Sequence, residues 1–344
     1  MNDRGPDDQR ALSIRDIARL AGVSRQTVSR VLNGERYIKP STEAQVRKVI
    51  EEHSWRPNSA ARALATSRSK TIGLLVSSRS HYGPFTAATA IDEAARARGY
   101  AIVSATIARD DDDAIAEAID AFAAQGVDGV VVIAPQQRAK EALQRVAIRV
   151  PIVSLHWKDD GSGHVAAFDQ EAGARLATRH LIELGHTRIR HLAGPQDWSE
   201  AEDRMNGFLG ELNDHDLPVT APLLGDWTSD LGYEVGLKLL DHPDFTAVFA
   251  SNDQMALGLM HAAADLGLSV PDDLSIVGFD DIPEAKHFAP PLTTIRQDFG
   301  WLGARAIDVL LAQIEGDDAA IAPAYPVPEL IVRQSTAPPR DGRR

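Results

Sequence analysis

The chain of 344 residues contains no cysteine. This absence excludes disulfides, thiolate metal sites and cysteine nucleophiles, and it is compatible with a reducing cytoplasm. No apolar run approaches the roughly 20 residues that a membrane-spanning helix needs. The first ten residues, MNDRGPDDQR, are polar and lack the apolar segment of a signal peptide. We therefore expect a cytoplasmic protein that does not enter membranes and begins with a disordered tail over residues 1–11.

The net charge of −13 hides an uneven distribution of charged residues. Residues 1–70 hold 14 basic and 8 acidic side chains, a net charge of +6, whereas the remaining residues hold 22 basic and 41 acidic ones, a net charge of −19. Hydrophobic residues make up 44% of the chain, enough for a sizeable core in each of about two or three compact units. The asymmetry predicts a small N-terminal part that binds a polyanion, followed by an acidic body.

The basic part has the pattern of short helices joined by a tight turn. Ser13 followed by Asp16 predicts a capping box at the start of a first helix, which Gly22 ends. Ser24 predicts the cap of a second helix, which runs to a turn beginning at Asn33. Two helices joined in this way are typical of the helix-turn-helix arrangement.

The second helix carries side chains of the types that read DNA bases. Val28 and Val31 face the expected core, which leaves arginine, glutamine and serine on the other side. Arginine pairs with guanine and glutamine with adenine in the major groove. A third helix, opened by a capping box of Thr42 and Gln45, completes a DNA-binding domain predicted over residues 12–57. The alternative is a solvated amphipathic helix. The expected DNA contacts in this domain are Ser13, Ser24, Arg25, Gln26, Thr27, Ser29, Arg30, Asn33, Tyr37 and Thr42.

The stretch DIARLAGVSRQTVSRVLNG, residues 16–34, resembles the DNA-binding part of the lactose/galactose-repressor family of bacterial transcription regulators. The resemblance extends from about Ser13 to the end of the body and so covers nearly the whole chain. It implies an all-α helix-turn-helix domain joined to an α/β core that has two lobes, as in periplasmic sugar-binding proteins. It also implies a repressor that binds double-stranded operator DNA as a homodimer and that a small molecule regulates.

Residues 58–69 are expected to form a hinge helix and linker. Pro57 ends the preceding helix, and Asn58 can cap a helix of about eight residues, which is marginally stable alone in water. The resemblance implies that two such helices pair in the DNA minor groove, with Asn58, Ala61 and Leu64 as contacts and Leu64 as an apolar wedge. The alternative is a flexible linker in which Leu64 makes an ordinary contact.

From Thr71 onward, short apolar strands alternate with helices in two series. This rhythm predicts two lobes of parallel sheets flanked by helices. Helices are expected to begin near Glu171, Arg204, Asp230 and Asp253. The expected strands are residues 71–76, 101–106, 129–134, 150–155, 189–194, 247–251 and 275–279. The resemblance implies a core over residues 70–336, with an N-lobe of about 70–168 and 298–327, a C-lobe of about 169–297 and 328–336, and a flexible tail over 337–344.

Polar and aromatic residues at the strand ends predict an effector site, because open α/β sheets bind ligands beyond the carboxyl ends of their strands. Carboxylate, guanidinium and amide groups beside flat rings suit a mono- or disaccharide, which has many hydroxyls and apolar faces. The expected contacts are Ser77, His81, Tyr82, Phe168, Arg204, Trp227, Asn252, Asp280 and Gln297. The family resemblance supports these positions, and Arg204 matches the arginine that grips the effector. Other roles are packing for Trp227 and helix capping for Asn252 or, more so, Asp253.

The chain departs from the family pattern at His156 and Trp157, where close relatives of the lactose-repressor type carry an aspartate. This departure leaves the particular sugar open. A further alternative is a purine corepressor that strengthens DNA binding, and another is a transport-type sugar-binding protein, which the DNA-binding domain argues against. The C-terminal residues contain no leucine heptads, so we expect a dimer rather than a coiled-coil tetramer.

Motifs of enzymes and cofactors are absent. There is no Walker-type phosphate loop, and the GSG at residues 161–163 lacks the strand-to-helix context of a dinucleotide site. The 11 histidines are scattered, with no spacing typical of a metal site. Asp280, Asp281 and Glu200 could in principle supply an acid/base pair for glycoside cleavage. The DNA-binding domain argues against this alternative, because such a domain is seldom joined to a hydrolase. We therefore expect no enzymatic activity, no cofactor and no metal.

Overall fold

The computed structural model describes residues 12–32, 37–55, 68–77, 81–107, 112–145, 150–155, 165–241, 243–317 and 325–340. The chain divides into two compact units, Met1–Ser69 and Lys70–Arg344, and each is described by itself. Among the helices of the described residues, none is long and apolar enough to cross a membrane. Some positions singled out in the sequence lie outside the described residues: Asn33, Asn58, Ala61, Leu64, His156 and Trp157.

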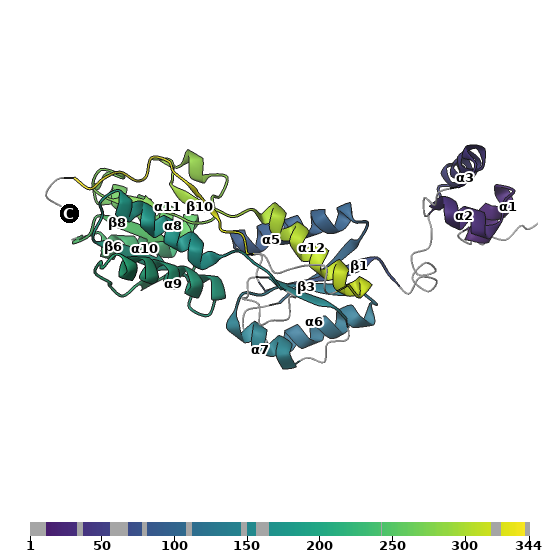
Figure 1. Cartoon of the computed structure of the whole chain (residues 1–344), viewed down its shortest axis with the longest axis horizontal. Coiled ribbons are helices and arrows are strands. Elements are labelled where there is room, and N and C mark those ends of the chain that lie inside the picture. The colour runs from purple at the N-terminus through teal and green to yellow at the C-terminus, as the bar shows by residue number, and fades with distance from the viewer. Residues whose placement is uncertain are drawn as a thin grey trace, which may run out of the picture. The chain divides into compact units, whose positions relative to one another are not determined.

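The described residues of the first unit form a helical bundle of α1 (Ile14–Leu20), α2 (Arg25–Leu32) and α3 (Pro40–Glu52) (Figure 1). The predicted capping box at Ser13 is present, since its side chain accepts from the backbone N–H of Asp16 and the Asp16 carboxylate accepts from the backbone N–H of Ser13. Trp55, after α3, donates from Nε1 to the carbonyl oxygen of Leu12 and so ties the two ends of the bundle together. The core of the bundle consists of Ile17, Ala18, Ala21, Val28, Val31, Val46, Val49 and Trp55.

The predicted capping box at Thr42 is wrong, because α3 begins two residues earlier, at Pro40. Proline is favoured at the first position of a helix, where its fixed φ angle fits and no hydrogen-bond donor is required. Lys39 precedes the helix in extended conformation and makes no side-chain capping bond. Thr42 therefore lies in the first turn of α3 rather than at its cap.

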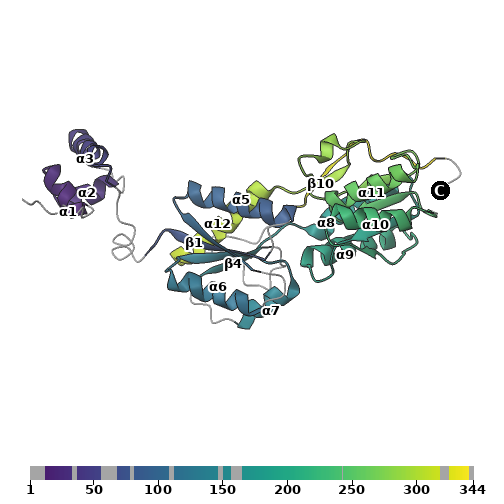
Figure 2. The same cartoon turned by 180° about the vertical axis from the view of Figure 1, so that it is seen from behind.

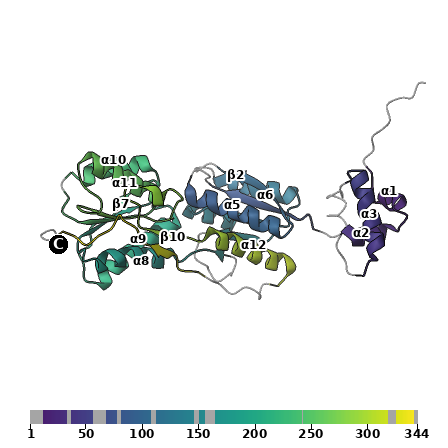
Figure 3. The same ribbon diagram turned by 90° about the horizontal axis from the view of Figure 1, so that it is seen from above.

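The second unit contains two α/β lobes. In the first lobe, a parallel sheet has the strand order β2-β1-β3-β4-β5. Figure 3 shows α5 and α12 side by side on one face of this sheet, and α6 and α7 cover the other face. The elements of the first lobe are β1 (Thr71–Val76), α5 (Tyr82–Ala97), β2 (Ala101–Thr106), α6 (Asp112–Ala124), β3 (Gly129–Ile133), α7 (Gln137–Arg145), β4 (Ile152–Leu155), β5 (Val165–Ala166) and α12 (Phe299–Glu315).

The second lobe repeats this architecture with four parallel strands in the order β7-β6-β8-β9. Helices α10 and α11 pack on one face of the sheet, and α8 and α9 pack on the other (Figure 2). The elements of the second lobe are α8 (Gln170–Glu183), β6 (Ile189–Ala193), α9 (Ser199–Asp214), β7 (Leu223–Leu224), α10 (Ser229–Leu239), β8 (Ala247–Ala250), α11 (Asp253–Asp265), β9 (Ser275–Val277) and the 3₁₀ turn η1 (Ala285–His287).

The chain passes between the lobes at the end of β5, before α12 and before β11 (Glu329–Ile331). β11 pairs antiparallel with β10 (Thr294–Arg296), which immediately precedes the passage to α12. The backbone N–H of Asp169 donates to the carbonyl oxygen of Pro326 (3.2 Å), so two of these passages run side by side. We call this region, residues 167–169, 297–298 and 326–328, the hinge. The fold class predicted from the sequence is confirmed.

Candidate DNA-binding surface and effector site

Helix α2 turns its polar side outward. Ser24, Arg25 and Gln26 are exposed, whereas Val28 and Val31 are buried in the bundle. The Oγ atom of Ser24 accepts from the backbone N–H of Thr27 (3.1 Å), which confirms Ser24 as the cap of α2. Of the other predicted contacts, Ser13 is exposed, and the half-buried ones are Thr27, Ser29, Arg30 and Thr42.

Tyr37 has an unusual position for a large aromatic residue. Its side chain is 96% exposed, and its φ angle of 85° lies in the left-handed region that non-glycine residues seldom adopt. Such a conformation costs on the order of 1–3 kcal/mol and is typical of functional positions. A ring that packs against nothing among the described residues of the first unit is available for a contact with a phosphate or deoxyribose of DNA.

In the second unit, four buried side chains form a chain of hydrogen bonds. Arg204, in the second turn of α9, donates from Nε to Oε1 of Gln170 (2.9 Å) and from Nη1 to the carbonyl oxygen of Ser251 (2.5 Å). Gln170 donates to Oε1 of Gln297 (2.8 Å), and Gln297 donates to Oδ1 of Asp280 (2.8 Å). The Nη2 atom of Arg204 lies 3.7 Å from the same Asp280 oxygen. We call Gln170, Arg204, Asp280 and Gln297 the polar network; none of its side chains is more than 7% exposed.

Burial perturbs both charges of the polar network. It raises the pKa of Asp280 to about 7, although the positive charge of Arg204 acts in the opposite direction. The nearby carboxylate of Glu200, itself buried, adds to the rise. Burial also lowers the pKa of Arg204, against the attraction of Asp280. Asp280 therefore changes its charge near neutral pH, while the arginine stays positive.

Aromatic rings enclose the guanidinium group of Arg204. Its Cζ atom lies 3.8 Å from the ring centroid of Phe279 and 5.6 Å from that of Trp227. Cation–π contacts of this kind are strongest where water is excluded. The rings thus help to hold a buried arginine whose hydrogen bonds go to the Gln170 amide and the Ser251 carbonyl, with the Asp280 carboxyl 3.7 Å away.

Asp253 stabilises the segment next to the polar network. It is completely buried, and its carboxylate accepts from the Thr294 hydroxyl (2.5 Å) and from the backbone N–H of Ile282 (2.8 Å). A Cβ atom at Gly278 would lie 2.2 Å from its Oδ1, so only glycine fits there. Burial raises the pKa of Asp253 well above its ordinary value. Its role is to fix the loop that carries Asp280.

The predicted assignment of Asp253 as the cap of α11 is wrong, because Asn252 is the cap. The Asn252 side-chain oxygen accepts from the backbone N–H of Met255 (2.9 Å), and its amide donates to the carbonyl oxygen of Trp227 (3.0 Å) and to Gln254 (3.0 Å). These bonds occupy both N–H groups of the amide. In this geometry Asn252 acts by positioning Trp227, and its contact with an effector stays a prediction.

Trp227 packs in the core of the second lobe, beside Trp198. Its φ angle is +74°, and its ring passes so close to Gly194 that a Cβ atom there would lie 2.2 Å from the ring. Its Nε1 atom is buried and finds no acceptor among the described residues. Buried donors are nearly always hydrogen-bonded in folded proteins, so this one marks a place for a ligand or water oxygen.

The first lobe adds a second group of side chains. Ser77, after β1, donates from Oγ to Oε1 of Gln136 (2.8 Å), and both are buried. The ring of His81 meets the edge of Trp198 at 5.3 Å between centroids, and Trp198 meets Trp227 at 5.5 Å. His81 of the first lobe and Trp227 of the second are thus brought together at Trp198, a residue that the sequence analysis missed.

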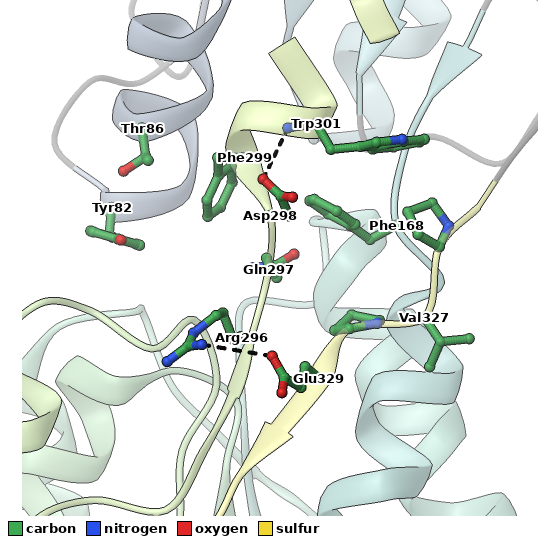
Figure 4. Close-up of a pocket in the computed structure, with 12 residues that line it drawn as sticks. Tyr82, Thr86, Phe168, Arg296, Gln297, Asp298, Phe299, Trp301, Val327 and Glu329 are labelled. Carbon is green, nitrogen blue, oxygen red and sulfur yellow. Dashed lines mark hydrogen bonds and ion pairs between the residues drawn. The ribbon is translucent and has the colours of Figure 1, made fainter. Parts of the chain in front are cut away.

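A pocket of about 510 Å³ lies at the hinge (Figure 4). Three predicted effector contacts line it, namely Tyr82, Phe168 and Gln297, and Gln297 also belongs to the polar network. Burial raises the pKa of Tyr82, and the charge of Asp280 adds to the rise. The pocket is lined by Tyr82, Thr86, Phe168, Arg296, Gln297, Asp298, Phe299, Trp301, Pro326, Val327, Pro328 and Glu329.

One wall of the pocket is aromatic. Phe299 meets Tyr82 at 5.9 Å and Phe168 at 6.0 Å between ring centroids, and Phe168 meets Trp301 at 5.9 Å. Figure 4 shows Phe299 between Tyr82 and Phe168, with the ion pair of Arg296 and Glu329 (3.6 Å) on another side. Rings and amides in one cavity suit a ligand with both apolar faces and polar edges.

Several site residues were missed in the sequence. Gln136 follows β3 and Gln170 follows β5. The rule that open α/β sheets bind ligands beyond the carboxyl ends of their strands could therefore have identified both. Phe299 and Trp301 lie on α12, whose return to the first sheet no local pattern indicates. Among the residues that the structure describes, no group of three or more His, Asp or Glu side chains is placed to hold a metal ion.

Comparisons with known proteins agree with this architecture. A family model described as bacterial regulatory proteins, lacI family, matches residues 13–58, and one described as periplasmic binding protein-like domain matches residues 178–336. The chain is 34% identical over 330 residues to the lactose operon repressor of Escherichia coli (strain K12), covering 95% of this chain and 91% of that protein.

Two solved structures are similar over nearly the whole chain. The structure of the lac repressor dimer bound to operator and the anti-inducer ONPF superposes with a TM-score of 0.84 at 33% identity, covering 95% of this chain and 100% of that one. A complex of the transcriptional regulator CelR with cellobiose superposes with a TM-score of 0.69 at 30% identity, covering 94% and 99%.

Proposed function

Because the chain belongs to the lacI family of bacterial regulatory proteins, we propose that it represses transcription as a homodimer on a near-palindromic operator and is released by a small sugar bound between its lobes. In this proposal α2 enters the major groove, and Arg25 and Gln26 contact base edges. In the predicted hinge helix of residues 58–69, Asn58, Ala61 and Leu64 contact the minor groove. The protein acts in the bacterial cytoplasm and carries out no catalytic step.

The observation that carries the effector assignment is the polar network, which reaches an aromatic pocket through Gln297. A buried amide or carboxylate gains from a ligand that completes its hydrogen bonds and rejects one that does not. A sugar presents hydroxyls to such groups and apolar C–H faces to rings. The similar CelR protein binds a disaccharide, cellobiose, which supports the same ligand class here.

Two copies of the DNA-binding domain read two half-sites, since a two-fold axis in the protein is mirrored in a near-palindromic operator. The similar lac repressor is a dimer on its operator, which supports this assembly. Sugar between the lobes favours one arrangement of the dimer, and the hinge helices separate from DNA. The coupling between sugar and DNA is reciprocal, so operator DNA weakens sugar binding by the same factor.

A thermal-shift screen against mono- and disaccharides tests the effector class. A ligand at about 100 times its Kd stabilises the folded state by about 2.7 kcal/mol, which raises the melting temperature measurably. Hits are then added to an operator-retention assay. Release of DNA supports the proposal, and a sugar that binds but strengthens retention contradicts the sign of the effect.

The aromatic wall of Phe168, Phe299 and Trp301 favours one further candidate, a purine corepressor stacked on these rings. Adenine, guanine and hypoxanthine therefore belong in the same screen. A purine that raises both melting temperature and DNA retention would replace the sugar proposal. Turnover of labelled oligosaccharides would contradict the absence of catalysis.

A further inference from the structure

The two lobes are joined a second time, away from the hinge, by a short backbone pairing. The N–H of Gln137 in the first lobe donates to the carbonyl oxygen of Asp197 in the second (2.9 Å). The N–H of Ser199 in the second lobe donates to the carbonyl oxygen of Pro135 in the first (3.1 Å). Residues 136 and 198 form an antiparallel bridge between them. The chain alone supplies every donor and acceptor of this pairing.

Both donors are the first residues of helices, Gln137 of α7 and Ser199 of α9. The first N–H groups of a helix have no partner within it and must find one elsewhere. Here each amide donates to a carbonyl that lies just before the other helix. That carbonyl belongs to the residue two positions before the first residue of that helix. The pairing therefore uses N–H groups that have no partner within their own helices, so it forms without breaking a hydrogen bond of either helix. Figures 1 and 2 show the starts of α7 and α9 at the border between the lobes.

Side chains seal the pairing on the side of the effector site. Trp198 is 4% exposed and lies against His81 of the first lobe and Trp227 of the second. Gln136 is held by Ser77, and its Nε2 atom is buried without an acceptor among the described residues. Helix α9 continues from the pairing to Arg204, so the same element joins it to the polar network.

We propose that residues 135–137 and 197–199 form a latch that holds the two lobes closed over the effector site and opens to admit the effector. The hinge keeps the lobes together at one side, and the latch is the removable contact at the other. Opening breaks two backbone hydrogen bonds and uncovers Trp198. The role as an effector gate depends on the proposed function, but the latch itself is a property of the chain and is testable without effector or DNA.

Proline at a helix's first position offers a selective test. Ser199→Pro removes the N–H donor, and Trp198 before it is already extended (φ −102°, ψ 123°), as a residue before proline must be. Gln137→Pro removes the other donor at the corresponding position of α7. The matched controls are Ser199→Ala and Gln137→Ala, which keep the N–H. Loss of one net hydrogen bond shifts the balance between closed and open forms by about fivefold.

The absence of cysteine allows two spin labels at introduced positions, Glu141→Cys on α7 and Glu202→Cys on α9, both exposed. Pulsed electron paramagnetic resonance on the full chain then measures the distance between the labels. We expect one short distance in the labelled parent and in both alanine controls. Each proline variant is expected to increase the population at longer distances by about fivefold.

Identical distance distributions in the proline and alanine variants would overturn the latch. Loss of helical circular dichroism in both proline variants would also overturn it, because the pairing would then be required for folding and could not be a removable contact. If the distances respond as expected but no sugar binds, the latch stands and the proposed effector class fails. If a sugar binds equally fast in all variants while the distances differ, the latch exists but does not gate entry, and that part of the proposal is wrong.

Discussion

Replacement of Asp280 by asparagine should change how the stability of the protein depends on pH. Burial raises the pKa of this carboxyl from 3.8 to about 7 in the folded chain. The folded state thus keeps a proton that the unfolded state loses, so stability from this group is complete below about pH 4 and declines as pH rises towards 7. Asparagine has the same shape and no such titration, so Asp280→Asn removes this part of the decline.

The magnitude follows from the shift in pKa. A difference of about three units between folded and unfolded states corresponds to about 4 kcal/mol once pH exceeds the folded pKa. Between about pH 5 and about pH 8, the part that falls in the measured window is about 2–3 kcal/mol. Asp253 is also buried with a raised pKa, and the charge of Asp280 contributes to that rise. Asp280→Asn therefore also weakens the pH dependence that comes from Asp253, which adds to the difference in the same direction.

The assay is urea unfolding of the full chain, followed by tryptophan fluorescence, for wild type and Asp280→Asn at both pH values. We expect the wild-type free energy of unfolding to fall by about 2–3 kcal/mol more than that of the variant on going to the higher pH. A Gln254→Ala variant, which alters a neighbouring amide outside the polar network, should keep the wild-type dependence. Parallel pH dependence in wild type and Asp280→Asn would refute the assignment of a shifted carboxyl at this position.

Three further substitutions test separate parts of the molecule. Arg204→Ala should abolish the response of DNA retention to effector and lower stability by about 3–5 kcal/mol, because it leaves Asp280 buried without its partner; an effector response that survives would exclude Arg204 from the site. Gly194→Ala should lower the melting temperature, since its Cβ atom would lie 2.2 Å from the Trp227 ring, and the overpacking costs about 1–3 kcal/mol; an unchanged melting temperature in calorimetry would contradict this close approach. Arg25→Ala should weaken operator binding by about 1–3 kcal/mol while nonspecific binding changes less, measured at fixed salt; equal losses would reduce Arg25 to a phosphate contact.

Much of the fold follows from local patterns. The seven expected strands are present, with ends shifted by at most two residues, because short, mostly apolar runs between turn signals are typical of buried strands. The first residues of helices follow less well from local patterns than the strands do. α9 begins at Ser199 rather than near Arg204, since no side-chain cap marks its first turn. Arg204 consequently lies inside the helix, where its side chain reaches both Gln170 and Ser251.

The strand-end rule locates chemistry but not partners. It placed Asp280, Gln297 and Asn252 near one edge, and the structure joins the first two within the polar network. It did not distinguish Asn252 from Asp253, because both residue types cap helices equally well. The choice depends on Thr294, about forty residues later in the chain, whose hydroxyl binds Asp253 and leaves the capping role to Asn252.

The latch shows why such contacts escape sequence reasoning. Its hydrogen bonds come from backbone groups, which every residue has, and its position depends on where two helices from different lobes begin. Trp198 has no apolar periodicity around it and reads as a single surface tryptophan until His81 and Trp227 are placed beside it. In this protein, local sequence patterns therefore predict the individual strands and helices. The contact that couples the lobes depends on the tertiary structure and cannot be predicted from such patterns. Variation in effector response among related chains should then depend as much on the side chains that cover the latch, those of Gln136 and Trp198, as on the groups that touch the ligand.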